Sequence, residues 1–208
     1  MSKRTMAITL GLGILVIISI AYYSGRTSTT KDNLPTEVGI REKIEKLNTS
    51  GEIFEISKEM YVPKLMKKYL QINYPELAGQ STQPWELYVT GASGDVRKVA
   101  SFERSASIFS TSTDDRYLLI ATFGDHYCDG LPMITVIGTK DDAIIYESEL
   151  IIPDAVVTNK NAIISSVDWS ALDMANIEAA VVECSAESVK KAYSVKLDLL
   201  SQKQNLVR

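Results

Sequence analysis

The sequence predicts an α+β fold behind a hydrophobic N-terminal helix: two helices, then a mainly antiparallel β meander of seven to eight strands, arranged as a sandwich or a single curved sheet. Three observations support this fold class. Residues 6–23 are uncharged and largely apolar, apolar residues recur at helical spacing between 36 and 70, and the hydrophobic period changes to two from Trp85 onward. The chain therefore divides into a membrane anchor or signal peptide (1–23), a flexible tether (24–35) and one extracytoplasmic domain (36–208).

The segment 6–23 predicts a membrane-spanning helix. At 1.5 Å per residue it would extend about 27 Å, close to the thickness of the hydrocarbon core of a bilayer. Lys3 and Arg4 precede it, so the positive-inside rule predicts a cytoplasmic N-terminus and an extracytoplasmic domain. The residues that we expect in the membrane include Met6, Leu10, Leu15, Ile18, Tyr22 and Tyr23.

A removed signal peptide is the alternative to a permanent anchor. Ser19-Ile20-Ala21 is a small-x-small triplet, and cleavage after Ala21 would release a secreted domain. Tyr22 and Tyr23 extend the apolar stretch as an interfacial aromatic pair, which favours the anchor. We therefore expect a single-pass cell-membrane protein whose domain is extracytoplasmic, which in a Gram-negative organism means periplasmic.

The charge of the domain argues against nucleic acid as a partner. The first 30 residues hold three of the 22 basic residues and none of the 26 acidic ones, so the rest of the chain has a net charge of −7. A surface this acidic repels phosphate backbones. The predicted contact with a membrane is therefore made by the N-terminal helix alone.

Two helices are predicted at the start of the domain. The first covers 37–48, because Ile40, Ile44 and Leu47 share one helical face and Asn48 is a stop signal. The second begins at Pro63 and ends before Pro75. Its apolar stripe consists of Val62, Leu65, Met66, Tyr69 and Leu70. A short strand at 53–56 separates the two helices.

The rest of the chain reads as strands joined by turns. Ser105–Thr113 is predicted to be a loop or a polar edge strand, and no internal repeat is apparent. The predicted strands are Trp85–Thr90, Val96–Phe102, Arg116–Phe123, Pro132–Thr139, Ala143–Leu150, Ala162–Trp169, Ile177–Cys184 and a last one over 191–199.

One loop holds the residue types that chemistry would need. His126 is the only histidine, and Cys128, Asp125 and Asp129 lie within three residues of it. A thiolate nucleophile requires a base within hydrogen-bond reach, and His126 is the only imidazole available to Cys128. The simpler interpretation is a solvated loop tied down by a disulfide between Cys128 and Cys184, the only two cysteines, as expected in an oxidising compartment.

No metal site or cofactor is predicted. Structural zinc takes four cysteine or histidine ligands, and the chain has three such residues. The loop 125–130 has too few oxygen ligands for calcium. Gly91 and Gly94 lead into a strand rather than into a helix N-terminus, so they do not form a phosphate cradle.

These observations predict a membrane-anchored, extracytoplasmic binding or accessory domain of a cell-envelope complex. Its expected partners are the membrane, through the N-terminal helix, and one or more envelope proteins. The role is predicted to be non-catalytic, because no catalytic constellation is present. The alternative is an envelope hydrolase or thiol-dependent enzyme that acts through His126 and Cys128.

Overall fold

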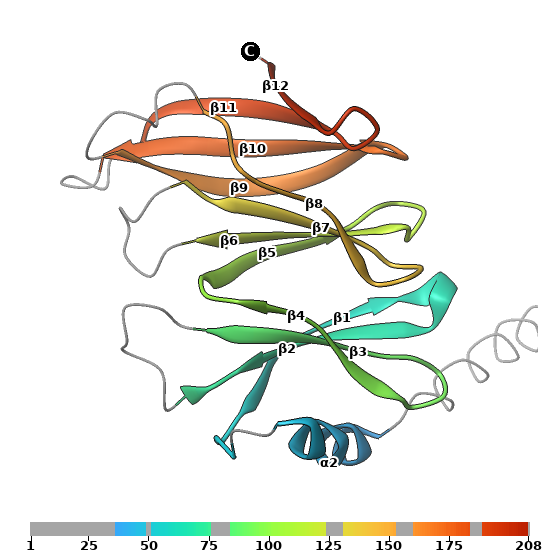
Figure 1. The fold of residues 1–208 in the computed structure, drawn as a ribbon. Helices are drawn as coiled ribbons and strands as arrows, with labels where there is room; N and C mark the ends of the chain where they lie inside the picture. Colours follow the sequence, from blue (N-terminus) through green and yellow to red (C-terminus); the bar gives the residue numbers. More distant parts are fainter. Residues whose placement is uncertain are drawn as a thin grey trace, which may run out of the picture.

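The computed structural model describes residues 36–48, 51–75, 84–123, 131–152, 160–183 and 189–207. This part of the chain is mainly β: one helix is followed by twelve antiparallel strands in three four-stranded sheets (Figure 1). The predicted anchor 1–23 and tether 24–35 lie outside the described residues.

Each sheet is a meander in which consecutive strands are neighbours. The helix α2 (Glu37–Leu47) precedes all three. The N-terminal sheet contains β1 (Glu55–Val62), β2 (Lys67–Asn73), β3 (Trp85–Thr90) and β4 (Val96–Phe102). The middle sheet contains β5 (Ser105–Thr111), β6 (Tyr117–Phe123), β7 (Met133–Gly138) and β8 (Ala143–Glu149). The C-terminal sheet contains β9 (Lys160–Ala171), β10 (Met174–Glu183), β11 (Val189–Asp198) and β12 (Lys203–Val207).

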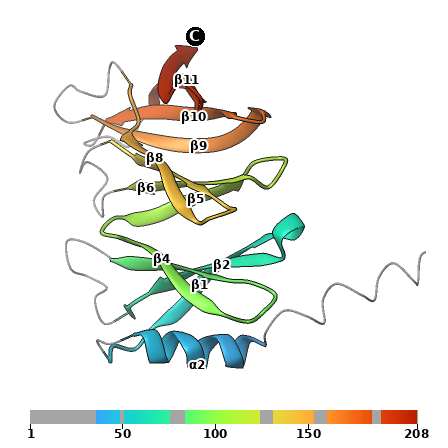
Figure 2. The ribbon, with the colours of Figure 1, turned by 45° about the vertical axis from the view of Figure 1, so that its right-hand side comes forward.

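The elements form four layers. α2 covers the N-terminal sheet, the middle sheet follows, and the C-terminal sheet closes the stack at the far end from α2 (Figures 1 and 2). Three clusters of buried apolar side chains separate the layers, one at each interface. Stacking buries faces that no single sheet could bury alone.

The helix α2 confirms the first predicted helix. The hydroxyl of Thr36 accepts a hydrogen bond from the backbone N–H of Gly39 at 3.4 Å and caps the N-terminus. Ile40 and Ile44 are buried against the N-terminal sheet, in a cluster with Phe54, Leu70, Ile72, Tyr74 and Tyr88. The helix therefore acts as a lid over the outer face of that sheet.

The second predicted helix is wrong. Pro63–Leu65 form one 3₁₀ turn, Met66 adopts a left-handed conformation with φ of 48°, and the chain reverses into β2. Tyr69 packs toward the middle sheet, whereas Leu70 packs toward α2. Both faces of β2 are covered, so apolar residues occupy adjacent positions, and this run imitates a helical stripe.

The middle sheet is covered on both faces. Leu118 and Ile120 of β6 face the N-terminal sheet, and Leu119 and Ala121 of the same strand face the C-terminal sheet. All four side chains are fully buried. A strand covered on both sides is expected to be continuously apolar, which is the pattern found here.

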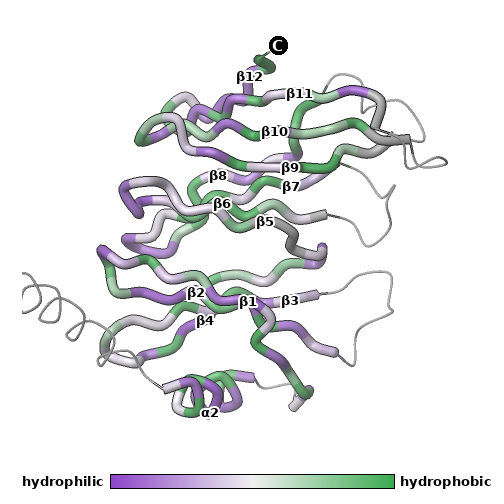
Figure 3. Tube along the Cα trace, turned by 180° about the vertical axis from the view of Figure 1, so that it is seen from behind, coloured by the Kyte–Doolittle hydropathy of each residue, from purple (hydrophilic) through white to green (hydrophobic). Residues whose placement is uncertain are grey.

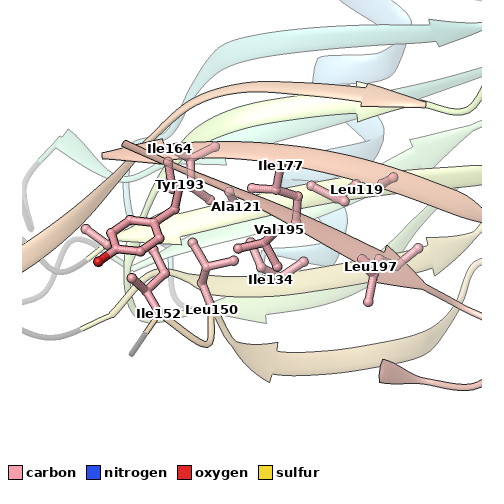
Figure 4. Close-up of a cluster of buried hydrophobic side chains, with 14 of the residues drawn as sticks. Leu119, Ala121, Ile134, Leu150, Ile152, Ile164, Ile177, Tyr193, Val195 and Leu197 are labelled. Carbon is pink, nitrogen blue, oxygen red and sulfur yellow. The ribbon is translucent and has the colours of Figure 1, made fainter. Parts of the chain in front are cut away.

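The C-terminal sheet has one covered face, so its strands alternate. Tyr193, Val195 and Leu197 of β11 are buried against the middle sheet, as the predicted half-buried pattern requires. Figure 4 shows these residues packed with side chains of β6, β7 and β10. The intervening Ser194 and Lys196 are half-exposed, and Figure 3 shows the same mixture of hydrophobic and hydrophilic residues along this layer.

The antiparallel meander is confirmed, but its strand count and its grouping differ from the prediction. The described residues form twelve strands in three stacked sheets, not seven or eight in a sandwich or a single curved sheet. Ser105–Thr111 is the edge strand of the middle sheet, which confirms the second of its two alternatives. The short strand β12 was not predicted, because five mostly exposed residues have little hydrophobic periodicity.

Candidate binding groove

The residues predicted from sequence to carry chemistry are not among those that the structure describes. Asp125, His126, Cys128 and Asp129 lie in 124–130, and Cys184 lies in 184–188. The disulfide and the alternative catalytic loop therefore stay predictions. The six membrane residues named above also lie outside the described residues.

Neither a membrane-spanning helix nor a cluster of metal ligands is present among the described residues. Between Thr36 and Val207, leaving aside the gaps, there is no helix with the length and hydrophobicity needed to cross a membrane. The same residues contain no group of three or more His, Cys, Asp or Glu side chains placed to hold a metal ion.

A groove lies beside the outer edge of β8, where the middle sheet meets β12 of the C-terminal sheet. Its volume is about 570 Å³. β8 supplies one wall, with Ile151 just beyond it, and residues 202–204 supply the other. Both β8 and β12 are edge strands, so the groove is bordered by backbone that has no further strand to pair with in its own sheet.

Glutamine side chains hold the two walls together. The amide of Gln204 donates to the backbone carbonyl of Glu149 at 2.8 Å and to the hydroxyl of Tyr146 at 2.9 Å. Its carbonyl oxygen accepts from the backbone N–H of Ile151 at 2.8 Å. Gln202 donates to the carbonyl of Ile145 at 3.4 Å. Side-chain amides thus take the place of a strand along this edge.

Apolar side chains are exposed around the groove. Ile144 and Ile151 line it and are 45% and 59% exposed, and Leu206 and Val207 of β12 are 46% and 45% exposed. Scattered exposed apolar residues are ordinary on protein surfaces, but a group beside an unpaired strand edge is typical of an interaction surface.

A second, smaller pocket of about 270 Å³ surrounds Glu86. Tyr74 and Tyr88 donate their hydroxyl hydrogens to Oε2 of Glu86 at 2.7 and 2.8 Å, and Lys98 forms an ion pair with Oε1. Partial burial alone would raise the pKa of Glu86, but the hydrogen bonds from Lys98, Tyr74 and Tyr88 outweigh it and lower that pKa. These contacts therefore favour the ionised carboxylate of Glu86.

The Glu86 cluster predicts a pH dependence of stability. Because the pKa of Glu86 is lowered in the folded chain, its stabilisation is complete above the unfolded value of about 4.5 and is lost as pH falls through the folded pKa. We expect Glu86→Gln to lose less stability than the wild type between pH 5 and pH 3, as measured by urea unfolding at each pH. Equal losses in both proteins would contradict the assignment.

A third polar cluster joins two sheets. Asp142, in the turn between β7 and β8, has a side chain only 1% exposed. Lys67 of β2 donates to both of its carboxylate oxygens, at 3.0 and 2.9 Å, and Arg97 of β4 and the hydroxyl of Tyr69 bind the same carboxylate. Burial raises the pKa of Tyr69, and the hydrogen bond to Asp142 raises it further. This cluster ties the middle sheet to the N-terminal sheet.

The two carboxylate clusters are held by partners from the same chain. Glu86 and Asp142 each accept from three side chains of the same chain. The β8–β12 groove differs, because backbone groups of its edge strand are bound by the side chains of Gln202 and Gln204. Sequence reasoning missed this site, since the relevant signal was only the tendency of Ile144 and Ile145 to form a strand.

The fold and the groove together define a class: stacked four-stranded antiparallel meanders with a lateral groove along one strand edge. No protein-family model matches the chain, and no curated protein matches it in sequence.

Solved structures give only distant matches. An uncharacterised protein, lmo1340, from Listeria monocytogenes is 9% identical with a TM-score of 0.40, covering 67% of this chain and 36% of that one. A mutant of puromycin hydrolase is 8% identical with a TM-score of 0.40, covering 74% of this chain and 31% of that one. The chain thus spans about a third of the length of each, and neither match carries a function over to it.

Proposed function

We propose that this chain is a non-catalytic binding module, held at the outer side of a membrane by its N-terminal segment as an accessory of a cell-envelope complex. The observation that carries the proposal is the groove along β8, where an unpaired strand edge is covered by glutamine side chains rather than by another strand. Such an edge suits recognition of another polypeptide.

Two further features support this function. The apolar segment 6–23, with Lys3 and Arg4 before it, would restrict the domain to the membrane surface and raise its effective concentration for neighbouring proteins. The partly buried carboxylate of Glu86 and the buried carboxylate of Asp142 each accept from three side chains of the chain itself, so neither is a free acid or base.

Purification of the full chain from solubilised membranes tests the proposal. A protein partner is expected to co-purify at a fixed ratio when the N-terminal segment is intact, and to be lost at equal expression when residues 1–23 are replaced by a cleavable signal. A chain that purifies alone from membranes, in detergents that preserve other envelope complexes, would contradict the accessory role.

The topology is tested separately. Two reporter enzymes are fused after Arg208, one that works only outside the cytoplasm and one that works only inside it. Only the first is expected to be active, because Lys3 and Arg4 keep the N-terminus in the cytoplasm. Activity of a reporter that requires the cytoplasm would overturn the predicted orientation. The mass of the mature protein distinguishes the anchor from a signal peptide cleaved after Ala21.

The alternative enzyme function depends on His126, the only imidazole in the chain. For a binding module, His126→Ala is expected to change the free energy of unfolding by no more than about 0.5 kcal/mol and to leave partner binding intact. For a hydrolase or thiol enzyme, the same change would lower activity by roughly a hundredfold or more. Loss of biological function in a folded His126→Ala variant would favour the enzyme.

A further inference from the structure

We propose that the β8–β12 groove receives an extended segment of a partner protein, which adds to the edge of β8 as a further strand. The inference rests on the proposed binding function and deepens it, because it names the site and the chemistry of the partner. Strand addition of this kind derives its affinity from main-chain hydrogen bonds and its specificity from alternate side chains.

Beyond Tyr146 the backbone of β8 presents hydrogen-bonding groups to the groove in alternation, whereas at Ile145 the register with β7 shifts. Successive residues of a strand direct their N–H and C=O groups to opposite sides. The carbonyls of Ile145 and Glu149 and the N–H of Ile151 all meet glutamine side chains in the groove, whereas the N–H of Leu150 donates toward β7, to Pro132, at 2.8 Å. The odd-numbered positions therefore face the groove.

Glu147 lies midway along this edge. By the same alternation its backbone N–H and C=O face the groove, and no side chain of the described residues binds them. The peptide group of Glu147, on an exposed strand edge bordered by Ile144 and Ile151, is accessible to the main chain of an added strand.

Gln204 already imitates part of such a strand. Its side-chain amide donates to the carbonyl of Glu149 and accepts from the N–H of Ile151, two residues further on. A residue of a parallel neighbouring strand offers one donor and one acceptor to positions spaced in this way. Gln204 is a flexible side chain, so an incoming main chain can replace it without breaking a backbone ladder.

Three other strand edges of the described chain, β1, β4 and β12, carry features that disfavour addition. β1 and β4 contain lysine or arginine side chains and an irregular register, between Ile56 and Lys58 in β1 and opposite Leu87 and Tyr88 for β4. β12 is five residues long and begins with Lys203. β8 also has an irregular register, at Ile145, but it has no basic residue and exposes Ile144, so it lacks the positive charge present on β1, β4 and β12.

Charge indicates the side chains of the partner. Glu147 is exposed, its carboxylate meets only the neutral hydroxyl of Thr135 at 3.3 Å, and no basic side chain of the described residues pairs with it. The domain as a whole has a net charge of −7. The expected occupant is therefore an extended segment in which apolar residues, for Ile144 and Ile151, alternate with lysine or arginine.

The test uses a fluorescent heptapeptide, Val-Lys-Val-Lys-Val-Lys-Val, titrated with the detergent-solubilised full chain by anisotropy. We expect saturable binding. One version of the peptide is N-methylated at its valine amides and another at its lysine amides. Only one of the two versions should bind at least tenfold more weakly, because only one edge of the added strand forms hydrogen bonds with β8. If both methylated peptides lose affinity equally, or neither does, strand addition is wrong.

Protein variants locate the site. Glu147→Pro removes the N–H that faces the groove and leaves those that bond to β7. It is expected to weaken binding of the heptapeptide at least tenfold. The matched variant Glu147→Gln removes only the charge, so its loss of affinity for the heptapeptide should be severalfold smaller than that of Glu147→Pro. A thermal melt checks folding, and if Glu147→Pro unfolds, the N-methylated peptides on the wild-type chain still decide the matter.

The remaining outcomes separate this inference from the proposed function. If the chain self-associates in sedimentation, Glu147→Pro abolishes the association and the heptapeptide does not bind, the occupant is a second copy and the proposal is wrong. If a membrane partner co-purifies equally with the wild type and with folded Glu147→Pro, the accessory function stands and the groove is not its site. If the peptide binds as expected but no membrane partner exists, the groove stands and the accessory function fails.

Discussion

Replacing Trp85 by alanine is expected to lower the free energy of unfolding by about 4 kcal/mol, within the range of large-to-small core substitutions. Trp85 is 1% exposed and lies between the N-terminal and middle sheets. Its ring stacks on Phe102 with centroids 4.1 Å apart, and Phe109 packs at 5.8 Å. Its indole N–H donates to the carbonyl of Arg104 at 2.6 Å, so the substitution also leaves that acceptor unpaired.

Urea unfolding followed by far-UV circular dichroism measures this effect. Trp85→Phe keeps most of the apolar volume and loses the N–H donor, so its cost is expected to be clearly smaller. Leu172→Ala, at a residue 55% exposed in the turn between β9 and β10, serves as a surface control within about 0.5 kcal/mol. A loss below about 1 kcal/mol for Trp85→Ala would contradict a packed interface between these two sheets.

Asp142→Asn is expected to destabilise the chain by about 3 kcal/mol, the low end for removing one partner of a buried ion pair. The change leaves Lys67 and Arg97 facing each other without their carboxylate. The effect stays at the low end because these side chains are 20% and 56% exposed and keep some hydration. Asparagine removes the charge without straining the backbone, since position 142 has φ of 59° and asparagine tolerates the left-handed region.

Asp141→Asn is the matched control for Asp142→Asn. Asp141 is exposed in the same turn, and its carboxylate accepts only from the backbone N–H of Ala143 at 3.3 Å. A loss below about 0.5 kcal/mol is expected, as for other surface substitutions. Equal effects of the two substitutions would show that the turn itself, and not the buried carboxylate, holds the two sheets together.

Local sequence was sufficient where one face of an element is covered and the other is exposed. Ile40 and Ile44 predicted the helix α2, and the alternation from Tyr193 to Asp198 predicted a half-buried strand. Turn residues around Gly91 and Gly94 placed β3 and β4 at their observed bounds. In each case the period of the apolar residues matches the geometry of the element, so no distant contact is needed to assign it.

Local sequence failed where burial comes from other layers. The sequence of β2 predicts a helix, because apolar residues occupy both faces of the strand. Both faces are covered only because α2 and the middle sheet pack on either side of its sheet. The division of twelve strands into three sheets depends on which meander stacks on which, and no repeat in the sequence marks it.

The candidate groove also combines features that local sequence predicts with features that only the packing of the sheets decides. The sequence by itself determined a strand at Ala143–Leu150, a strongly acidic domain and an apolar N-terminal segment with positive charge before it. Only the tertiary structure decided that this strand is an edge and that Gln202 and Gln204, more than 50 residues away, cover it. An edge is defined by the absence of a neighbouring strand, and that absence is a property of the packed layers, which no local pattern of residues can encode.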